Sequence, residues 1–167
     1  MVSRQRRRTL CATLALSALL GACAQIDQHR IPTDLAQKVW RGRLALRVES
    51  DPVQSFSAGL ELRGDAQAGE LRLFSPLGTT QLVVSWRPGQ ATLRRDGQAR
   101  EYDSMSSLTQ AALGADLPMN ALFAWLAGDN ARIAGWQADL SGLGSGRLAA
   151  RRSEPAPVAE LRLILEP

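Results

Sequence analysis

Residues 40–63 read WRGRLALRVESDPVQSFSAGLELR, and this stretch decides the fold class. Apolar and polar residues alternate over 40–48 and again over 55–63, and Asp51-Pro52 between the two runs marks a turn. A period of two places successive side chains on opposite faces of a strand. Two such runs joined by a turn predict an antiparallel pair of strands with one apolar face.

The same alternation recurs along the chain and predicts a meander of short strands. Asp96-Gly97 is a strong signal for a two-residue hairpin between two of them. Arg87-Pro88-Gly89 marks another turn. Beyond the first pair, the predicted strands are 70–73, 81–86, 91–93, 98–102, 136–140, 147–150 and 159–165.

Two helical stretches interrupt the predicted strands. Asp103 or Ser104 is expected to cap the first, which ends at Gly114. The second opens at Pro118, carries an apolar stripe at helical spacing and closes at Gly128. A further short helix is expected from Thr33 or Asp34 through Trp40. The resulting architecture is a curved sheet with helices on its apolar face, enclosing either a packed core of side chains or a cavity.

The N-terminus has the features of a bacterial lipoprotein signal. Arginines at 4 and 6–8 precede an apolar run, 10–20, which as a helix spans about 16 Å against about 30 Å for a bilayer core. The run ends Leu20-Gly21-Ala22-Cys23, which is typical of a lipobox, so a signal peptide over 1–22 is predicted. The alternative is an ordinary signal peptide followed by an incidental cysteine.

Cleavage before Cys23 would leave this thiol as the site of a covalent diacylglycerol, with an N-acyl chain on the same residue, and no other cofactor is expected. Residues 23–33 are predicted to be the lipidated cysteine and a tether, and 34–167 a single domain. Cleavage also removes Cys11, so the mature chain has no disulfide. Ala24, where an aspartate would retain the protein in the inner membrane, favours the outer membrane by analogy.

Charge and composition argue against nucleic-acid binding and catalysis. The formal net charge is +4, but residues 23–167 contain as many acidic as basic residues, so no basic domain is indicated. His29 is the only histidine, and Gly142–Gly146 is followed by a strand pattern rather than by the helix that a phosphate loop needs. Arg94-Arg95 and Arg151-Arg152 are interpreted as solvated strand ends, with contact to phosphate as the alternative. No enzyme is predicted.

The segment Ser75-Pro76-Leu77-Gly78-Thr79-Thr80 joins two predicted strands and should form a tight turn. Pro76 fixes φ and Gly78 permits a positive φ, while Leu77 lies where a polar residue is usual. Leu77 either folds back onto the core or stands exposed on a stiff prong. An exposed leucine would gain about 1.5–3 kcal/mol on entering lipid.

Several segments in this order resemble the LolB family of outer-membrane lipoprotein receptors. The resemblance covers roughly Trp40 to Trp136 and weakens after that, where the chain is short before Pro167. The turn motif and the Leu-Pro helix are its most specific parts. The matching pieces are the lipobox ending at Cys23, GRLAL at 42–46, residues 56–64, SPLGTT at 75–80, Leu117-Pro118 and WLAG at 125–128.

The resemblance implies a mainly β (α+β) fold, an unclosed antiparallel barrel with a helical lid over an apolar cavity. It implies a monomer, anchored by lipid in the outer membrane and facing the periplasm, that receives lipoproteins from the soluble carrier LolA. The acyl chains of the client would enter the cavity and pass to the inner leaflet without ATP. By the same analogy Leu77 is the membrane prong. The implied lining is Leu60, Leu71, Leu73, Leu82, Val84, Leu122, Phe123, Trp125 and Leu163.

Two other functional classes remain open at this point. A passive outer-membrane lipoprotein could use the same sheet as a scaffold for envelope assembly, which predicts a solid core and a harmless change at Leu77. A soluble carrier like LolA shares the fold, but the lipobox argues against it because a carrier must leave the membrane.

Overall fold

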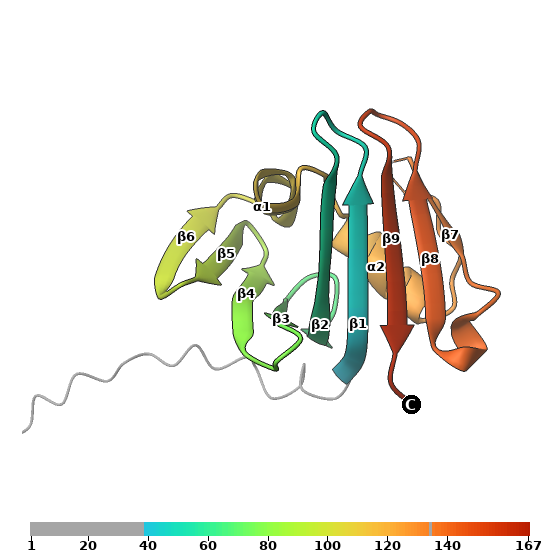
Figure 1. The fold of residues 1–167 in the computed structure, drawn as a ribbon, viewed down its shortest axis with the longest axis horizontal. Coiled ribbons are helices and arrows are strands. Elements are labelled where there is room, and N and C mark those ends of the chain that lie inside the picture. Colours follow the sequence, from blue (N-terminus) through green and yellow to red (C-terminus); the bar gives the residue numbers. More distant parts are fainter. Residues whose placement is uncertain (1–38, 134) are drawn as a thin grey trace, which may run out of the picture. The chain divides into compact units, whose positions relative to one another are not determined.

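The computed structural model of the protein describes residues 39–133 and 135–167. In these residues, nine strands form a single antiparallel sheet in the order β6-β5-β4-β3-β2-β1-β9-β8-β7 (Figure 1). The strands are β1 (Val39–Val48), β2 (Gln54–Gly64), β3 (Gly69–Phe74), β4 (Thr80–Arg87), β5 (Gln90–Arg95), β6 (Gln98–Tyr102), β7 (Trp136–Asp139), β8 (Arg147–Arg152) and β9 (Ala159–Leu165).

The strand predictions are confirmed, and alternate burial follows the period of two along β1–β4, β8 and β9. In β1 every second residue from Gly42 to Val48 is buried, and Asp96 and Gly97 both have positive φ at the β5–β6 turn. The predicted helix through Trp40 is wrong at its C-terminal end. Val39 and Trp40 belong to β1, where Trp40 pairs with Leu62, since the strand pattern extends through them. The rest of that predicted helix lies outside the described residues.

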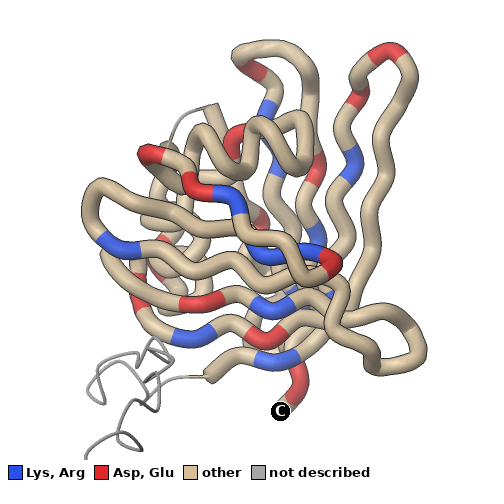
Figure 2. The backbone as a smooth tube through the Cα atoms, turned by 90° about the vertical axis from the view of Figure 1, so that its left-hand side faces the viewer, with Lys and Arg blue, Asp and Glu red and all other residues tan. Residues whose placement is uncertain are grey.

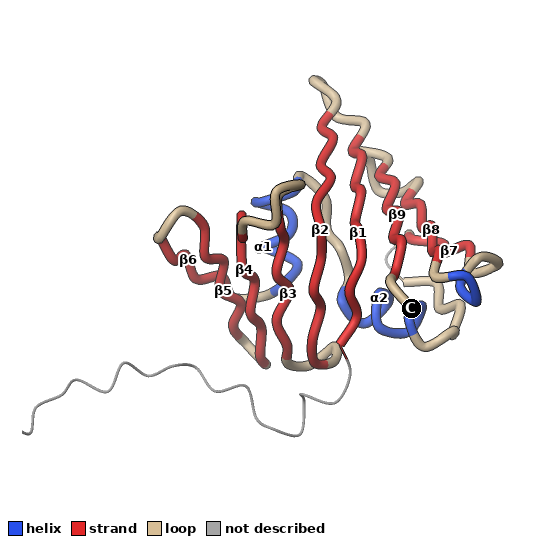
Figure 3. The backbone as a smooth tube through the Cα atoms, turned by 60° about the horizontal axis from the view of Figure 1, so that its bottom comes forward, coloured by secondary structure: helices blue, strands red, loops and turns tan. Residues whose placement is uncertain are grey.

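The sheet is strongly curved and does not close, because β6 and β7 lie at its two edges without pairing to each other. Two helices, α1 (Met105–Leu113) and α2 (Met119–Leu126), lie on one face of the sheet (Figures 1 and 3). This arrangement confirms the predicted fold class, an unclosed antiparallel barrel with a helical lid. The opposite face of the sheet, here called the outer face, carries most of the polar strand residues.

The boundaries of α1 follow from its caps. Ser104 is the N-cap, and its hydroxyl oxygen accepts a hydrogen bond of 3.1 Å from the backbone N–H of Ser107. Gly114, with φ of 70°, ends the helix in the left-handed conformation that favours glycine. The helix packs against β5 and β6 at one end of the sheet. Of the two predicted caps, Ser104 is therefore the correct one.

Aromatic side chains fix α2 to the sheet. The ring of Phe123 lies 5.3 Å from that of Trp40 and 6.2 Å from that of Trp86. Trp125 is fully buried, packs 6.2 Å from Trp136, and donates a hydrogen bond of 2.8 Å from Nε1 to the carbonyl of Ala131. The apolar side of α2 is therefore held to the sheet by contacts between aromatic rings.

The interpretation of Arg151-Arg152 as a solvated strand end is correct for Arg151 and wrong for Arg152. Arg151 is exposed and pairs with Glu160 at 2.6 Å, as a solvated strand end should. Arg152 is only 3% exposed; it donates to the carbonyl of Pro157 at 3.0 Å and lies over the ring of Trp136. Neighbouring residues of a strand point to opposite faces, so one of the pair had to face inward.

Candidate functional site

The loop between β3 and β4 is a tight turn built by its backbone. The N–H of Gly78 donates to the carbonyl of Ser75 at 2.9 Å, and the N–H of Ser75 donates to the carbonyl of Thr79 at 2.8 Å. The hydroxyl of Ser75 accepts a further hydrogen bond of 3.2 Å from the N–H of Thr79. Gly78 has φ of 81°, so its position favours glycine. The turn is therefore fixed without any contribution from the side chain of Leu77.

Leu77 lies at the tip of this turn with 93% of its surface exposed. The alternative in which it folds back onto the core is therefore wrong. The loop stands out from the sheet and contains no charged residue (Figure 2). A large apolar side chain held in water at the end of a rigid turn is available to enter an apolar phase. Its role as a membrane prong stays a prediction.

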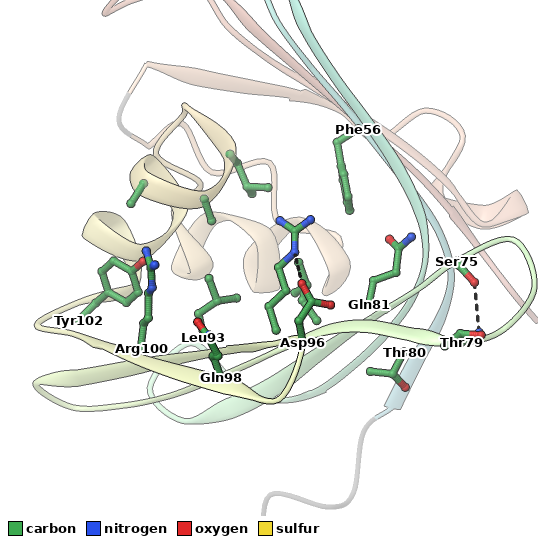
Figure 4. A pocket seen from close by; sticks show the side chains of 15 residues that line it. Phe56, Ser75, Thr79, Thr80, Gln81, Leu93, Asp96, Gln98, Arg100 and Tyr102 are labelled. Atoms are coloured by element: carbon green, nitrogen blue, oxygen red, sulfur yellow. Dashed lines mark hydrogen bonds and ion pairs between the residues drawn. The ribbon is translucent and has the colours of Figure 1, made fainter.

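A cavity of about 850 Å³ opens between α1 and the end of the sheet that carries β4, β5 and β6. Half-buried apolar side chains from four elements line it: Phe56, Leu93, Tyr102 and Leu113. Its rim is polar, with Gln81, Gln98 and Arg100 from the strands, and Asp96 paired with Arg95 (Figure 4). The volume lies within the range of pockets that enclose small-molecule ligands. Ser75 and Thr79 also line it, so the turn that carries Leu77 borders this cavity.

The nine residues implied as an acyl lining lie mostly elsewhere. Leu82 borders the cavity and also belongs to the packed core, and the others form or contact that core without bordering the cavity. Phe123 is half-buried against Trp40 and Trp86. Their role in acyl binding stays a prediction. The buried members of the set are Leu60, Leu71, Leu73, Leu82, Val84, Leu122, Trp125 and Leu163.

The sequence analysis did not identify Phe56, Leu93, Tyr102 or Leu113 as site residues. Phe56 lies on the predicted strand 55–63. Leu93 and Tyr102 lie on the predicted β5–β6 hairpin, and Leu113 lies at the end of the predicted first helix. The inward direction of the three strand residues was readable from the period of two. What the sequence did not reveal is that α1 stands away from these strands far enough to leave space.

A second hollow, of about 370 Å³, lies on the outer face beside the same turn. Pro76 and Gly78 of the turn line it together with Arg43, Gly59 and Phe74. Arg41, Glu61 and Glu166 also line it. We call this hollow the outer groove.

Glu61 in the outer groove is held by two arginines. Its carboxylate accepts hydrogen bonds of 2.9 Å from Nε of Arg41 and of Arg63. Burial alone would raise the pKa of Glu61, but the hydrogen bonds and charges of Arg41 and Arg63 outweigh it and hold this pKa below its usual 4.5. The ionised form is therefore the one that stabilises the folded protein.

We expect the thermal stability of the protein to depend on Glu61 in acid. A lowered folded-state pKa contributes stability that is present above about pH 4.5 and is lost as the pH falls through the folded value. Glu61→Gln should lower the free energy of unfolding by about 1 kcal/mol at neutral pH. The melting temperature of this variant should also fall less steeply in acid than that of wild type, and this fall is called the acid limb. Melting curves between neutral pH and pH 3 measure it, with Glu101→Gln on β6 as the control. An unchanged acid limb in Glu61→Gln would contradict the assignment.

Other motifs in the sequence take structural roles. Leu143–Ser145 form a single turn of 3-10 helix between the paired strands β7 and β8, so the strand predicted after the glycine-rich segment is confirmed. Within 39–133 and 135–167, no group of three or more His, Cys, Asp or Glu residues is placed to hold a metal ion. None of the helices that the structure describes is both long and apolar enough to cross a membrane.

Sequence comparison identifies relatives of this chain. The family described as "Outer membrane lipoprotein LolB" matches residues 37–154, which is most of the chain. The chain belongs to the LolB family. The match extends past Trp136, where the resemblance noted from the motifs weakens.

Individual LolB proteins agree with this assignment. The outer-membrane lipoprotein LolB of Bordetella petrii is 33% identical over 177 aligned positions, which cover 90% of this chain and 88% of that protein. LolB of Shewanella woodyi is 34% identical over 71% of this chain and 57% of its own length, and LolB of Bordetella parapertussis is 34% identical over 72% and 60%. As a LolB-family protein, the chain is an outer-membrane lipoprotein that acts in lipoprotein localisation. Cys23 and the predicted tether lie outside the described residues.

Proposed function

We propose that this LolB-family protein receives lipoproteins from the periplasmic carrier LolA and inserts them into the outer membrane without ATP. It does so as a monomer, anchored by acyl chains on Cys23. The acyl chains of the client occupy the cavity against its apolar wall, and Leu77 leads them into the inner leaflet. The observation that carries the proposal is the cavity of about 850 Å³ bordered by the turn that presents Leu77.

Such a transfer requires only that each successive site binds the acyl chains more favourably than the one before. Acyl chains move from carrier to receptor to bilayer if each step buries their apolar surface better than the last. The cavity wall offers apolar patches from Phe56, Leu93 and Leu113 beneath a polar rim. A half-covered acyl chain is bound less well there than in a bilayer, which favours release. The direction of transfer then comes from burial of apolar surface, and no nucleotide is needed.

The scaffold function stays as the second candidate because one observation favours it. Most of the residues implied as an acyl lining are packed in the core under α2, as a solid-cored scaffold would have them. The two functions differ in what they predict for the cavity wall. A scaffold accepts no client and tolerates a polar side chain in the cavity.

A transfer assay tests the proposal. Protein purified from membranes is mixed with a LolA–lipoprotein complex in the absence of ATP, and the client bound to each partner is measured. Wild type should take up the client, and Leu93→Gln should take it up about tenfold less well because one apolar contact is lost. Val53→Gln, in the exposed β1–β2 loop, is the matched control and should behave as wild type.

Failure has a clear form in this assay. If folded wild-type protein takes no client from a cognate carrier, the scaffold function replaces the proposal. If Leu93→Gln accepts clients as well as wild type does while melting normally, acyl chains do not use this cavity.

A further inference from the structure

The described residues are electrically balanced, with 14 arginines and 14 carboxylates, but the balance is not local. On the outer face of β1–β4 and β7–β9, nine strand arginines stand against four strand carboxylates. The remaining described residues therefore carry a net negative charge of the same size. A basic face on an outer-membrane lipoprotein points to an anionic partner.

One line of residues on this face runs straight across the sheet. The strand registers pair Arg147 with Ile164, Ile164 with Arg43, Arg43 with Gly59, and Gly59 with Phe74. At about 4.8 Å between strands, the line is roughly 19 Å long. It leads directly into the β3–β4 turn, which follows Phe74. We call these five residues the cross-strand row.

The row combines two cations with two large apolar side chains, of which Ile164 is exposed and Phe74 is half-buried. Leu77, Ile164 and Val53 are the large hydrophobic residues that are exposed in the described chain, at 93%, 57% and 52%. Ile164 is in the row, and Leu77 is at the tip of the turn that continues it. Val53 lies apart, in the loop after β1. Exposed apolar surface is therefore concentrated along the row and its turn.

The cations of the row are available for a ligand. No ion pair holds Arg43 or Arg147 within the part of the chain that the structure describes, and both are exposed. Gly59 has no side chain, so the outer groove beside Arg43 stays open. Two carboxylates also face the groove. Glu61 is neutralised by Arg41 and Arg63, and Glu166 lines the groove without a described ion pair.

The length of the chain limits the distance from the predicted anchor to the sheet. From Cys23 to Val39 the chain spans sixteen residues, which reach at most about 55 Å when fully extended. Arg43 follows the start of β1 by only four residues. The row is therefore close to the point at which the tethered chain enters the sheet.

We propose that the cross-strand row and the β3–β4 turn form one phospholipid-contact surface that orients the protein on the membrane. Arg43 and Arg147 bind headgroup phosphates, for which guanidinium has the matching fork of donors. Ile164, Phe74 and Leu77 face the boundary of the acyl chains. This inference rests on the proposed function, because it places Leu77 at the bilayer, and it adds the surface that brings Leu77 there.

Photo-crosslinking to lipid tests this surface. A photo-reactive benzophenone amino acid is placed at Leu77, or at Val53 as a positional control, in protein purified from membranes and reconstituted in vesicles. The vesicles contain phosphatidylcholine with or without phosphatidylglycerol, and lipid adducts are measured by mass spectrometry. Adducts should form from position 77 and not from position 53, and should increase with phosphatidylglycerol.

The arginines are then changed in the protein with the probe at position 77. Arg43→Gln and Arg147→Gln should each lower the adduct yield on anionic vesicles about fivefold, since one basic residue near such a surface contributes about that factor. Arg47→Gln, on the same strand and face but outside the row and without a described ion pair, should leave the yield unchanged. Melting curves confirm that each variant is folded.

The outcomes separate this inference from the proposed function. Equal yields from the Arg43→Gln, Arg147→Gln double variant and the Arg47→Gln variant would overturn the surface, whether or not clients are transferred. Equal adducts from positions 77 and 53 would also overturn it. A protein that takes no client from the carrier yet shows the expected adducts would sink the proposed function and leave the contact surface standing.

Discussion

Leu77→Glu is expected to accept a lipoprotein from the carrier and then fail to insert it. The leucine gains about 1.5–3 kcal/mol on entering lipid, and a carboxylate in its place costs about 2.5–3.5 kcal/mol within the apolar region. The combined change exceeds about 4 kcal/mol, which corresponds to roughly a thousandfold slower insertion. The measurement follows client transfer in two steps, first from carrier to this protein and then from this protein to vesicles.

The fold should not be affected by this change. The side chain of Leu77 is 93% exposed, and the turn is held by the backbone and the hydroxyl of Ser75. The melting temperature of Leu77→Glu should therefore match that of wild type. Val53→Glu introduces the same charge at another exposed apolar position and should insert clients normally. Insertion by Leu77→Glu at the wild-type rate would remove the prong from the proposed function and favour the scaffold.

Trp125→Ala is expected to have the largest effect on stability. The indole is fully buried, packs against Trp136 and donates a hydrogen bond to the carbonyl of Ala131. Removing it should cost about 3–5 kcal/mol through the cavity left behind, with a further loss from the unpaired carbonyl. For a protein of this size, that lowers the melting temperature by about 6–20 °C.

The matched variant for this position is Trp125→Phe. It keeps a ring against Trp136 but has no donor for Ala131, so it should lose about 1–2 kcal/mol. Thermal melts by circular dichroism give both values. A Trp125→Ala protein that melts within about 2 °C of wild type would show that α2 is held to the sheet by other contacts.

The strands were predictable because the sheet has one buried and one solvated face. Leu44, Leu46 and Val48 are buried while Arg43 and Arg47 between them are exposed, so burial alternates with the residues themselves. The caps were readable for a similarly local reason: Ser104 and Gly114 act within a few residues of their own positions. Trp40 shows where such local prediction fails. The residues before it suggest a helix, but Trp40 forms part of a strand that pairs with residues more than twenty positions away.

The cavity was not predictable in the same way. Leu73 and Leu93 are both inward-facing residues of short strands, and their sequence patterns are alike. Leu73 meets the packed core, whereas Leu93 faces the cavity beside α1. The difference arises from where each helix lies over the sheet, and this depends on tertiary packing rather than on periodicity. Leu77 was identified from the sequence because a large apolar residue is unusual in a tight turn. This signal depends only on neighbouring residues.

The unpaired edges of the sheet, β6 and β7, have a mechanical consequence. In a closed barrel the diameter is set by strand number and stagger, so the interior can widen only if a ladder of hydrogen bonds breaks. Here α1 covers the β5–β6 end through side-chain contacts, with no backbone ladder joining that end to β7. The width of the sheet can therefore change without breaking a ladder of backbone hydrogen bonds. On the proposed function, acyl chains of different lengths and numbers would be accommodated as α1 shifts against β5 and β6.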